Sequence, residues 1–204
     1  MSLPSNVQAR KKASSSAAHL KAINNATAGA IVLAAPTANL SGDVADIVAA
    51  FAGTVTTNTG TIEITDANTT DIQATDIATI NTAITGAITV TNTIDINGSG
   101  SDVAAAFTAI DTNTGNATAN VTGTDYTVAQ LKTINDATTG AIVLATPTAT
   151  LSGTVSDIKA AFAGTVTTNT GAVTISDANT TDIQATDITT INTAITGALT
   201  VPKT

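Results

Sequence analysis

One segment of this chain occurs twice almost without change. Residues 20–90 align without a gap with residues 131–201, a shift of 111 positions, and only 14 of the 71 aligned residues differ. The stretch Thr69–Ile77 recurs unchanged as Thr180–Ile188. When two copies of a unit are this similar and adjacent in the chain, the unit must fold into a shape to which a further copy can be added. We therefore expect a repeat architecture rather than a globule built around one central core.

A shorter period lies inside the long one, and glycines mark it. Each short unit, here called a rung, reads as a helical pattern, a glycine and then an alternating apolar run. The marking glycines are Gly29, Gly60, Gly86, Gly115, Gly140, Gly171 and Gly197. Their spacings are 31, 26, 29, 25, 31 and 26 residues, which gives seven rungs, and four rungs make up the 111-residue unit.

Apolar spacing before each glycine predicts a short helix. Val128, Leu131, Ile134 and Ala137 share one helical face, and the later rungs repeat this spacing. Helices of about ten residues are marginal alone in water, so we expect tertiary packing to stabilise them. The residues expected as N-caps are Asp43, Ser101, Thr127 and Thr186.

The residues after each glycine predict a strand. Ala30–Ala34 is a continuous apolar run, and later rungs alternate apolar with polar residues, as in the pairs Ile62 and Ile64 or Val173 and Ile175. Thr165–Thr168 indicates a second short extended piece. The glycines themselves fit a left-handed stop at the end of each helix.

One helix and one strand cannot bury both apolar faces within a single rung. Stacked rungs bury them if the strands pair into a parallel sheet and the helices line its other side. We therefore predict an α/β repeat solenoid of about seven helix-strand rungs, with a layout similar to leucine-rich repeats but without their L-x-x-L-x-L signature. Residues 1–16 are expected to form a basic N-terminal tail or cap, and residues 17–204 a single solenoid.

Charge narrows the classes of partner. The net charge is -8 and the pI about 4.2, while four of the seven bases lie in residues 1–21. Such an acidic body repels phosphate, so we expect no nucleic-acid partner. No run of 18 apolar residues occurs, so no membrane span is expected. Scarce lysine and glutamate with abundant threonine, asparagine and aspartate favour an extracellular, cell-surface or virion location.

The residues offer little for catalysis. The single histidine, His19, has no cysteine and no adjacent carboxylate with which to form a triad. The single glutamate, Glu63, is replaced by Thr174 in the second copy, as expected for a solvated strand position. With no cysteine, thiolate metal sites are excluded. We expect no enzyme, no catalytic residue and no organic cofactor.

Calcium is the one cofactor that the sequence leaves open. In the stretch 95–102, oxygen ligands stand at alternate positions around a glycine turn, at Asp95, Asn97, Ser99 and Asp102. Hard cations prefer six to eight oxygens, although this loop lacks a terminal bidentate glutamate. The alternative is that these residues form a turn and cap the next helix. A second candidate, residues 66–71, recurs as residues 177–182.

Threonine pairs of the form Thr-x-Thr recur along the predicted strands. Stacked in register, they would present a flat hydroxyl array able to order water on ice or to contact glycans. The alternative is that threonine simply suits the solvent face of a strand. A glycan or other surface ligand is therefore one candidate partner.

The segment Thr127–Leu144, T-V-A-Q-L-K-T-I-N-D-A-T-T-G-A-I-V-L, resembles the short repeats of very large Thr- and Asp-rich surface or virion proteins of marine cyanobacteria and their phages. The resemblance covers nearly the whole chain after residue 17, and it implies a structural or adhesive role. We therefore predict a structural module of an extracellular filament, surface layer, adhesin or virion appendage that self-associates end to end. The alternative is a module that binds calcium, glycan or ice.

Overall fold

A computed structural model describes residues 15–178 and 181–201, and over these ranges the chain is an α/β protein with parallel sheets, which confirms the predicted class. The predicted tail, residues 1–16, lies outside the described residues except for Ser15–Ser16, which form the first strand. The helices are α1 (Ala17–Ala26), α2 (Val44–Ala50), α3 (Ala74–Ala83), α4 (Gly100–Ala109), α5 (Val128–Ala137), α6 (Val155–Ala161) and α7 (Ala185–Ala194).

The strands are short, with two to four residues each. They are β1 (Ser15–Ser16), β2 (Leu40–Gly42), β3 (Ile62–Ile64), β4 (Asp71–Gln73), β5 (Ile88–Val90), β6 (Asp95–Gly98), β7 (Thr112–Asn113), β8 (Thr118–Val121), β9 (Ile142–Leu144), β10 (Leu151–Gly153), β11 (Val173–Ile175) and β12 (Leu199–Thr200).

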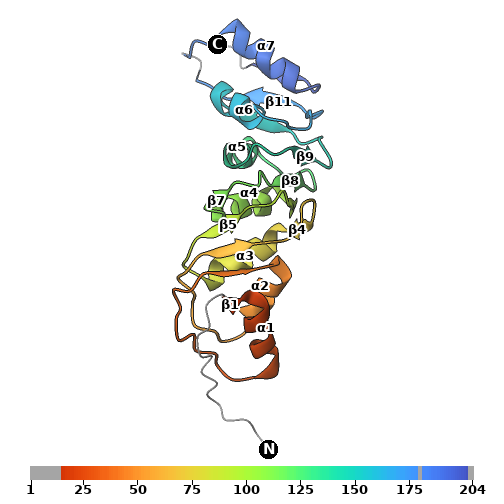
Figure 1. Cartoon of the computed structure of the whole chain (residues 1–204). Helices are drawn as coiled ribbons and strands as arrows, with labels where there is room; N and C mark the ends of the chain where they lie inside the picture. The colour runs from red at the N-terminus through yellow and green to blue at the C-terminus, as the bar shows by residue number, and fades with distance from the viewer. Residues whose placement is uncertain (1–14, 179–180, 202–204) are drawn as a thin grey trace, which may run out of the picture.

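The helices follow one another in chain order along an elongated molecule (Figure 1). Each helix packs against the next, from α1 on α2 to α6 on α7. The described C-terminal helix therefore lies at the opposite end of the molecule from α1 (Figure 1).

Three parallel sheets connect successive rungs, with the strand orders β1-β2-β3-β5-β7, β4-β6-β8-β9 and β10-β11-β12. Every pairing joins two strands that lie on either side of one helix in the sequence. Leu40, for example, pairs with Ile62, and Ile62 pairs with Ile88. Parallel strands require such a crossover, because a tight turn can join only antiparallel ones.

The core follows the two expected periodicities. In β3, Ile62 and Ile64 are fully buried while Glu63 between them faces solvent. In α5, Leu131 and Ile134 are fully buried, as the helical spacing predicts. The buried residues of all the rungs form one continuous apolar cluster.

The expectation that the marking glycines adopt a left-handed conformation is wrong. Positive φ occurs in the described glycines only at Gly53 and Gly123, neither of which belongs to the marking series. From Gly60 to Gly197, the marking glycines instead lie against the backbone of the preceding rung. A Cβ at Gly140 would stand 2.6 Å from the carbonyl oxygen of Ala117, and a Cβ at Gly86 would collide with the backbone of Gly60. Glycine is required here because two backbones approach closely.

Two predicted strands are less regular than expected. Within Ala30–Ala34, Ile31 forms only a single parallel bridge, with Val55, and within Thr165–Thr168 only Val166 does so, with Ile142. Two of the predicted N-caps are displaced by two residues, since the caps are Ser99 rather than Ser101 and Gln184 rather than Thr186. Asp43 and Thr127 occupy the predicted cap positions.

None of the helices in the described ranges combines the length and the apolar character needed to cross a bilayer.

Candidate functional site

Two of the four calcium candidates, Ser99 and Asp102, form a helix cap. Ser99 is the N-cap of α4, and its Oγ accepts a hydrogen bond of 3.2 Å from the backbone N–H of Asp102. The Ser99 hydroxyl donates in turn to Asp102 Oδ2 at 2.7 Å. A carboxylate in the first turn of a helix is favourable, because the unpaired N–H groups there carry partial positive charge. The turn-and-cap alternative therefore accounts for the side chains of Ser99 and Asp102.

The other two calcium candidates, Asp95 and Asn97, lie on the outer face of strand β6. Asp95 Oδ1 accepts a hydrogen bond of 2.9 Å from the Thr118 hydroxyl on the neighbouring strand β8. Asn97 donates through Nδ2 to Asp71 Oδ1 on β4, at 3.3 Å, and to the backbone oxygen of Asp95. These contacts run across the sheet β4-β6-β8-β9, and they connect three successive rungs.

The structure therefore divides the four calcium candidates into two hydrogen-bonded groups, Asp95 with Asn97 and Ser99 with Asp102. Across residues 15–178 and 181–201, no three His, Cys, Asp or Glu side chains come close enough together to hold a metal ion. A calcium ion in this region would have to take ligands from groups that already bind one another. Calcium coordination by these four residues stays a prediction.

In the second loop candidate, the first aspartate accepts a hydrogen bond from the start of a helix in a neighbouring rung. Asp66 is 8% exposed, and its Oδ2 accepts a hydrogen bond of 2.7 Å from the backbone N–H of Val44, the first residue of α2. Asp177 makes the equivalent contact of 2.7 Å with Val155, the first residue of α6. Burial raises the pKa of Asp66, an effect that the hydrogen bond from Val44 partly offsets.

Sequence reasoning missed this cap because donor and acceptor lie 22 residues apart. Local signatures such as the capping box describe only contacts within one helix end. One signal was available: the cap position itself changes from Asp43 to Thr154 between the copies, whereas the aspartates at 66 and 177 are the same.

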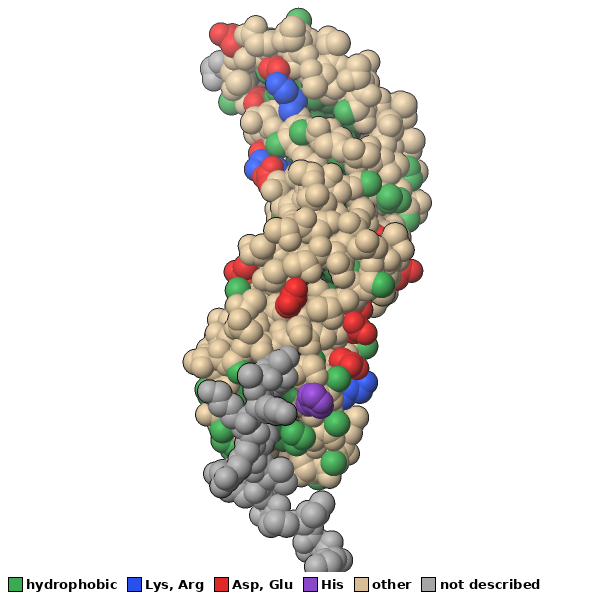
Figure 2. Space-filling model, viewed as in Figure 1, with side chains coloured by type: hydrophobic (Ala, Val, Ile, Leu, Met, Phe, Trp, Pro, Cys, Tyr) green, Lys and Arg blue, Asp and Glu red, His purple; other side chains and the backbone are tan. Residues whose placement is uncertain are grey.

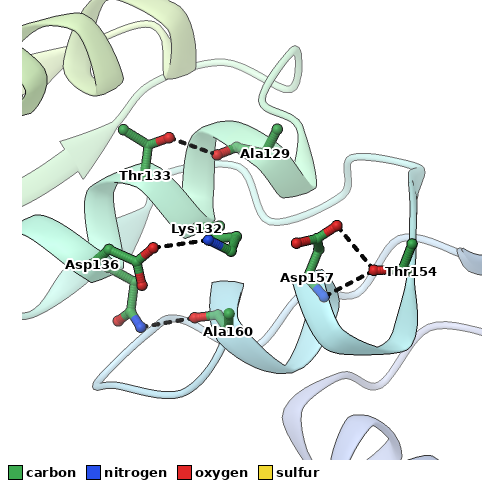
Figure 3. Close-up of polar contacts among 8 residues, drawn as sticks. Ala129, Lys132, Thr133, Asp136, Thr154, Asp157 and Ala160 are labelled. Carbon is green, nitrogen blue, oxygen red and sulfur yellow. Dashed lines mark hydrogen bonds and ion pairs between the residues drawn. The ribbon is translucent and has the colours of Figure 1, made fainter.

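Threonine hydroxyls are used in two ways. On the strands, outward side chains align in register across rungs, as in the rows Ser41, Glu63, Thr89, Thr112 and Ser152, Thr174, Thr200. Elsewhere the hydroxyls bond to backbone: Thr59 donates to Pro36 O of the preceding rung, and Thr133 to Ala129 O within α5 (Figure 3). With Ser16, which pairs with Ser41, the longest of these rows has five residues, so any hydroxyl array is narrow.

Ion pairs join neighbouring helices at two places in the chain. Lys21 on α1 binds Asp46 on α2 at 2.7 Å, and Lys159 on α6 binds Asp187 on α7 at 2.5 Å. Lys132 pairs with Asp136 inside α5 (Figure 3). That hydrogen bond raises the pKa of Lys132. The space-filling view shows scattered charges on a surface made mostly of other side chains and backbone (Figure 2).

A groove of about 570 Å³ lies between α6 and α7. Its apolar lining includes Ile158, Phe162 and Val166 on one side and Ile191 on the other. Among the described lining residues, Lys159 is the one titratable side chain, and it is paired with Asp187. The described lining is otherwise made of apolar side chains, glycine and threonine.

The two other residues weighed for chemistry are at the surface. His19 Nδ1 lies 3.1 Å from the Ser16 hydroxyl at the start of α1. Glu63 is exposed on β3, with the Thr91 hydroxyl 3.5 Å from its Oε1. Among these contacts the pair of His19 and Ser16 has no carboxylate to complete a triad, and Glu63 has no histidine or second carboxylate beside it.

A scan against protein-family models, a search of curated proteins and a search of solved structures each find no match to this chain.

Proposed function

We propose that the chain is a repeat solenoid of about seven helix-strand rungs, similar in layout to leucine-rich repeats. We further propose that it is a structural, self-associating module of an extracellular filament, surface layer, adhesin or virion appendage. The observation that carries this proposal is the close backbone approach at the marking glycines. It recurs from Gly60 to Gly197, so each rung is fitted to the backbone of the one before it.

The mechanism is mechanical. A continuous apolar core and parallel strand pairing resist bending, while Asp66, Asp177 and the two ion pairs between helices fasten neighbouring rungs. A net charge of -8 and a surface rich in hydroxyl and amide groups keep such a rod in solution. No catalytic role is proposed, because among the described contacts the pair of His19 and the Ser16 hydroxyl has no carboxylate to orient it, and Glu63 contacts a threonine hydroxyl.

Small-angle X-ray scattering on the purified chain tests the solenoid. An elongated particle is expected, with a radius of gyration well above the roughly 17 Å of a globular chain of this length. A compact particle near that value would contradict the proposal.

The alternative function is a surface module that binds calcium, glycan or ice. Its support is the alignment of polar side chains across rungs, with Asp71, Asp95 and Thr118 in one row and Gln73, Asn97 and Asn120 in the next. Calorimetric titration with calcium chloride separates the two functions. Heat that disappears in both Asp95→Ala and Asp102→Ala favours the binding module, and no heat in the parent chain favours the bare scaffold.

A further inference from the structure

The last described rung presents an apolar surface, here called the C-terminal face. Its residues come from the segment before α7, from α7 itself and from the β12 strand with the residue that follows it. They are Ile183, Ala185, Ile188, Leu199 and Val201.

The internal repeat provides a direct comparison for this face. The counterparts 111 positions earlier are Ile72, Ala74, Ile77, Ile88 and Val90. These counterparts are 5%, 1%, 0%, 0% and 0% exposed, respectively. On the C-terminal face Val201 is 43% exposed, Ala185 is exposed, and the other three are only partly buried. Near-identical sequence is therefore buried in one copy and uncovered in the other.

The structure shows which helix and which strands cover the internal counterparts. Helix α4 packs on α3, β6 pairs with β4, and β7 pairs with β5. The backbone N–H groups of Asp111 and Thr114 donate to the carbonyl oxygens of Ile88 and Val90, at 2.9 and 3.0 Å. Within residues 15–178 and 181–201, the strand β12, the counterpart of β5, pairs on one side only, with β11. The C-terminal face thus has the form of one half of a contact that the chain makes internally.

We propose that the C-terminal face binds the first rung of a second copy of this chain, so that β1 pairs in parallel with β12 and α1 covers α7. This inference rests on the proposed self-association and identifies its two surfaces. Strand β1 is suited to that place, because it is a two-residue strand of the same sheet as β7 and, among the described residues, also pairs on one side only, with β2. An uncovered strand edge of this kind is a ready template for another strand.

Burial at the first rung supports the same match. Ile23 and Leu33 are partly buried there, whereas their counterparts Ile134 and Leu144 are 0% and 2% exposed. Both ends of the described chain therefore leave apolar residues uncovered that the internal rungs bury.

The two matching surfaces lie at opposite ends of the described chain, β1 at one and β12 at the other, so the contact between them is head to tail. A head-to-tail contact joins two different surfaces, so it leaves a free end of each kind and continues into a filament.

The register of the contact makes one pair of residues diagnostic. Thr200 pairs with Thr174, and Ser16 pairs with Ser41, on the outward side of the respective strands. If β1 of one copy continues the sheet after β12 of another, Ser16 comes to lie beside Thr200. Neighbouring strands lie about 4.8 Å apart, which is within the Cα separation of a disulfide.

Cross-linking tests the orientation directly, because the chain has no cysteine of its own. Variants Ser16→Cys and Thr200→Cys are oxidised mildly, separately and as a mixture. We expect a product of twice the 20.0 kDa chain mass in the mixture and none in either variant alone. Cross-linking of Thr200→Cys with itself, or no product in the mixture, overturns the proposal.

Sedimentation velocity tests the surface. The variant Ala185→Lys/Val201→Lys places two charges on the C-terminal face, and Val143→Lys/Ala145→Lys places the same charges at exposed positions in the middle of the molecule. We expect the weight-average mass of the parent chain and of the control to rise about twofold or more with concentration, as for a micromolar Kd. The C-terminal variant should stay at 20.0 kDa.

The outcomes separate this inference from the proposed fold. A parent chain that stays monomeric, one that stops at a dimer, or equal association of both variants overturns the inference. If that monomer still sediments with the high frictional ratio of a rod, the solenoid stands without the end contact. A low frictional ratio contradicts the solenoid itself.

Discussion

The carbonyl oxygen of Gly60 occupies the place that a Cβ atom on Gly86 would need. Gly171 and Gly197 stand in the same relation 111 residues later. At these points successive rungs are in contact through their backbones, with no side chain between them. The spacing between rungs there is fixed by the absence of a Cβ, and the repeat conserves this relation in both copies.

Gly86→Ala is therefore expected to be among the most damaging small substitutions in the chain. The added methyl group meets backbone rather than a flexible side chain, so the rungs must move apart, at a cost of about 2–4 kcal/mol in the free energy of unfolding. Urea unfolding followed by circular dichroism measures the loss.

Gly53→Ala is the matched control. Gly53 has a φ of 80°, and a Cβ there would meet nothing within 4 Å. Its cost should be only the left-handed backbone penalty of about 1 kcal/mol. If Gly86→Ala costs no more than Gly53→Ala, the close approach between rungs is not what these glycines serve.

Sequence reasoning recovered the elements with a strong apolar period. The alternation of Ile62 and Ile64 predicted β3, and the spacing of Leu131 and Ile134 predicted α5. In both elements the buried residues repeat at the period that the local backbone imposes. The 111-residue repeat then extended these predictions from one copy to the other.

Strands β4 and β6 of the sheet β4-β6-β8-β9 were not predicted, because their local pattern resembles a turn. Strand β4 has one buried residue, Ile72, between Asp71 and Gln73, and β6 contains the Asp95 and Asn97 that suggested a calcium loop. These segments become strands through hydrogen bonds to the rung before and the rung after. No local pattern encodes a partner about two dozen residues away. The same reason explains why the cap between Asp66 and Val44 was missed.

Removal of that cap gives the second prediction. Asp66→Ala leaves the N–H of Val44 at the start of α2 without its acceptor, and it should cost about 1–2 kcal/mol. Asp177→Ala should cost a similar amount, because Asp177 makes the same contact with Val155. Thermal unfolding of both variants measures the effect. If both leave the midpoint unchanged, the contacts do not stabilise the fold.

Asp66 also makes stability depend on pH. Burial, with a smaller contribution from the nearby charge of Asp43, raises the pKa of Asp66 above its ordinary value of 3.8. The folded chain therefore binds this proton more tightly than the unfolded chain. The resulting stabilisation is complete below pH 3.8 and is lost as the pH rises through the raised pKa.

Asp66→Asn isolates this effect, because the amide is always neutral and its oxygen can still accept from Val44. We expect the variant to gain stability relative to the parent chain as the pH rises from about 3 to about 7. Urea midpoints of both proteins across that range measure the difference, in which the other carboxyl groups cancel. A difference that stays constant or falls with pH would contradict the raised pKa.

The two buried asparagines allow a comparison between the copies. Asn58 and Asn169 are 1% and 0% exposed, and each donates to the carbonyl oxygen of the glycine two residues later. Asn169 Oδ1 also accepts a hydrogen bond of 2.7 Å from the buried hydroxyl of Tyr126. Asn58 Oδ1 has no partner among the residues that the structure describes.

Tyr126→Phe should therefore cost about 1–3 kcal/mol, because it leaves Asn169 Oδ1 buried without a donor. Asn169→Ala should destabilise the chain more than Asn58→Ala by about 1–2 kcal/mol, since only Asn169 accepts from a tyrosine and only Asn169 donates to Ala149 O. Urea unfolding of the three variants provides the values. Equal losses at the two asparagines would mean that the bond from Tyr126 adds nothing, and that the second copy is held together no more firmly at this point than the first.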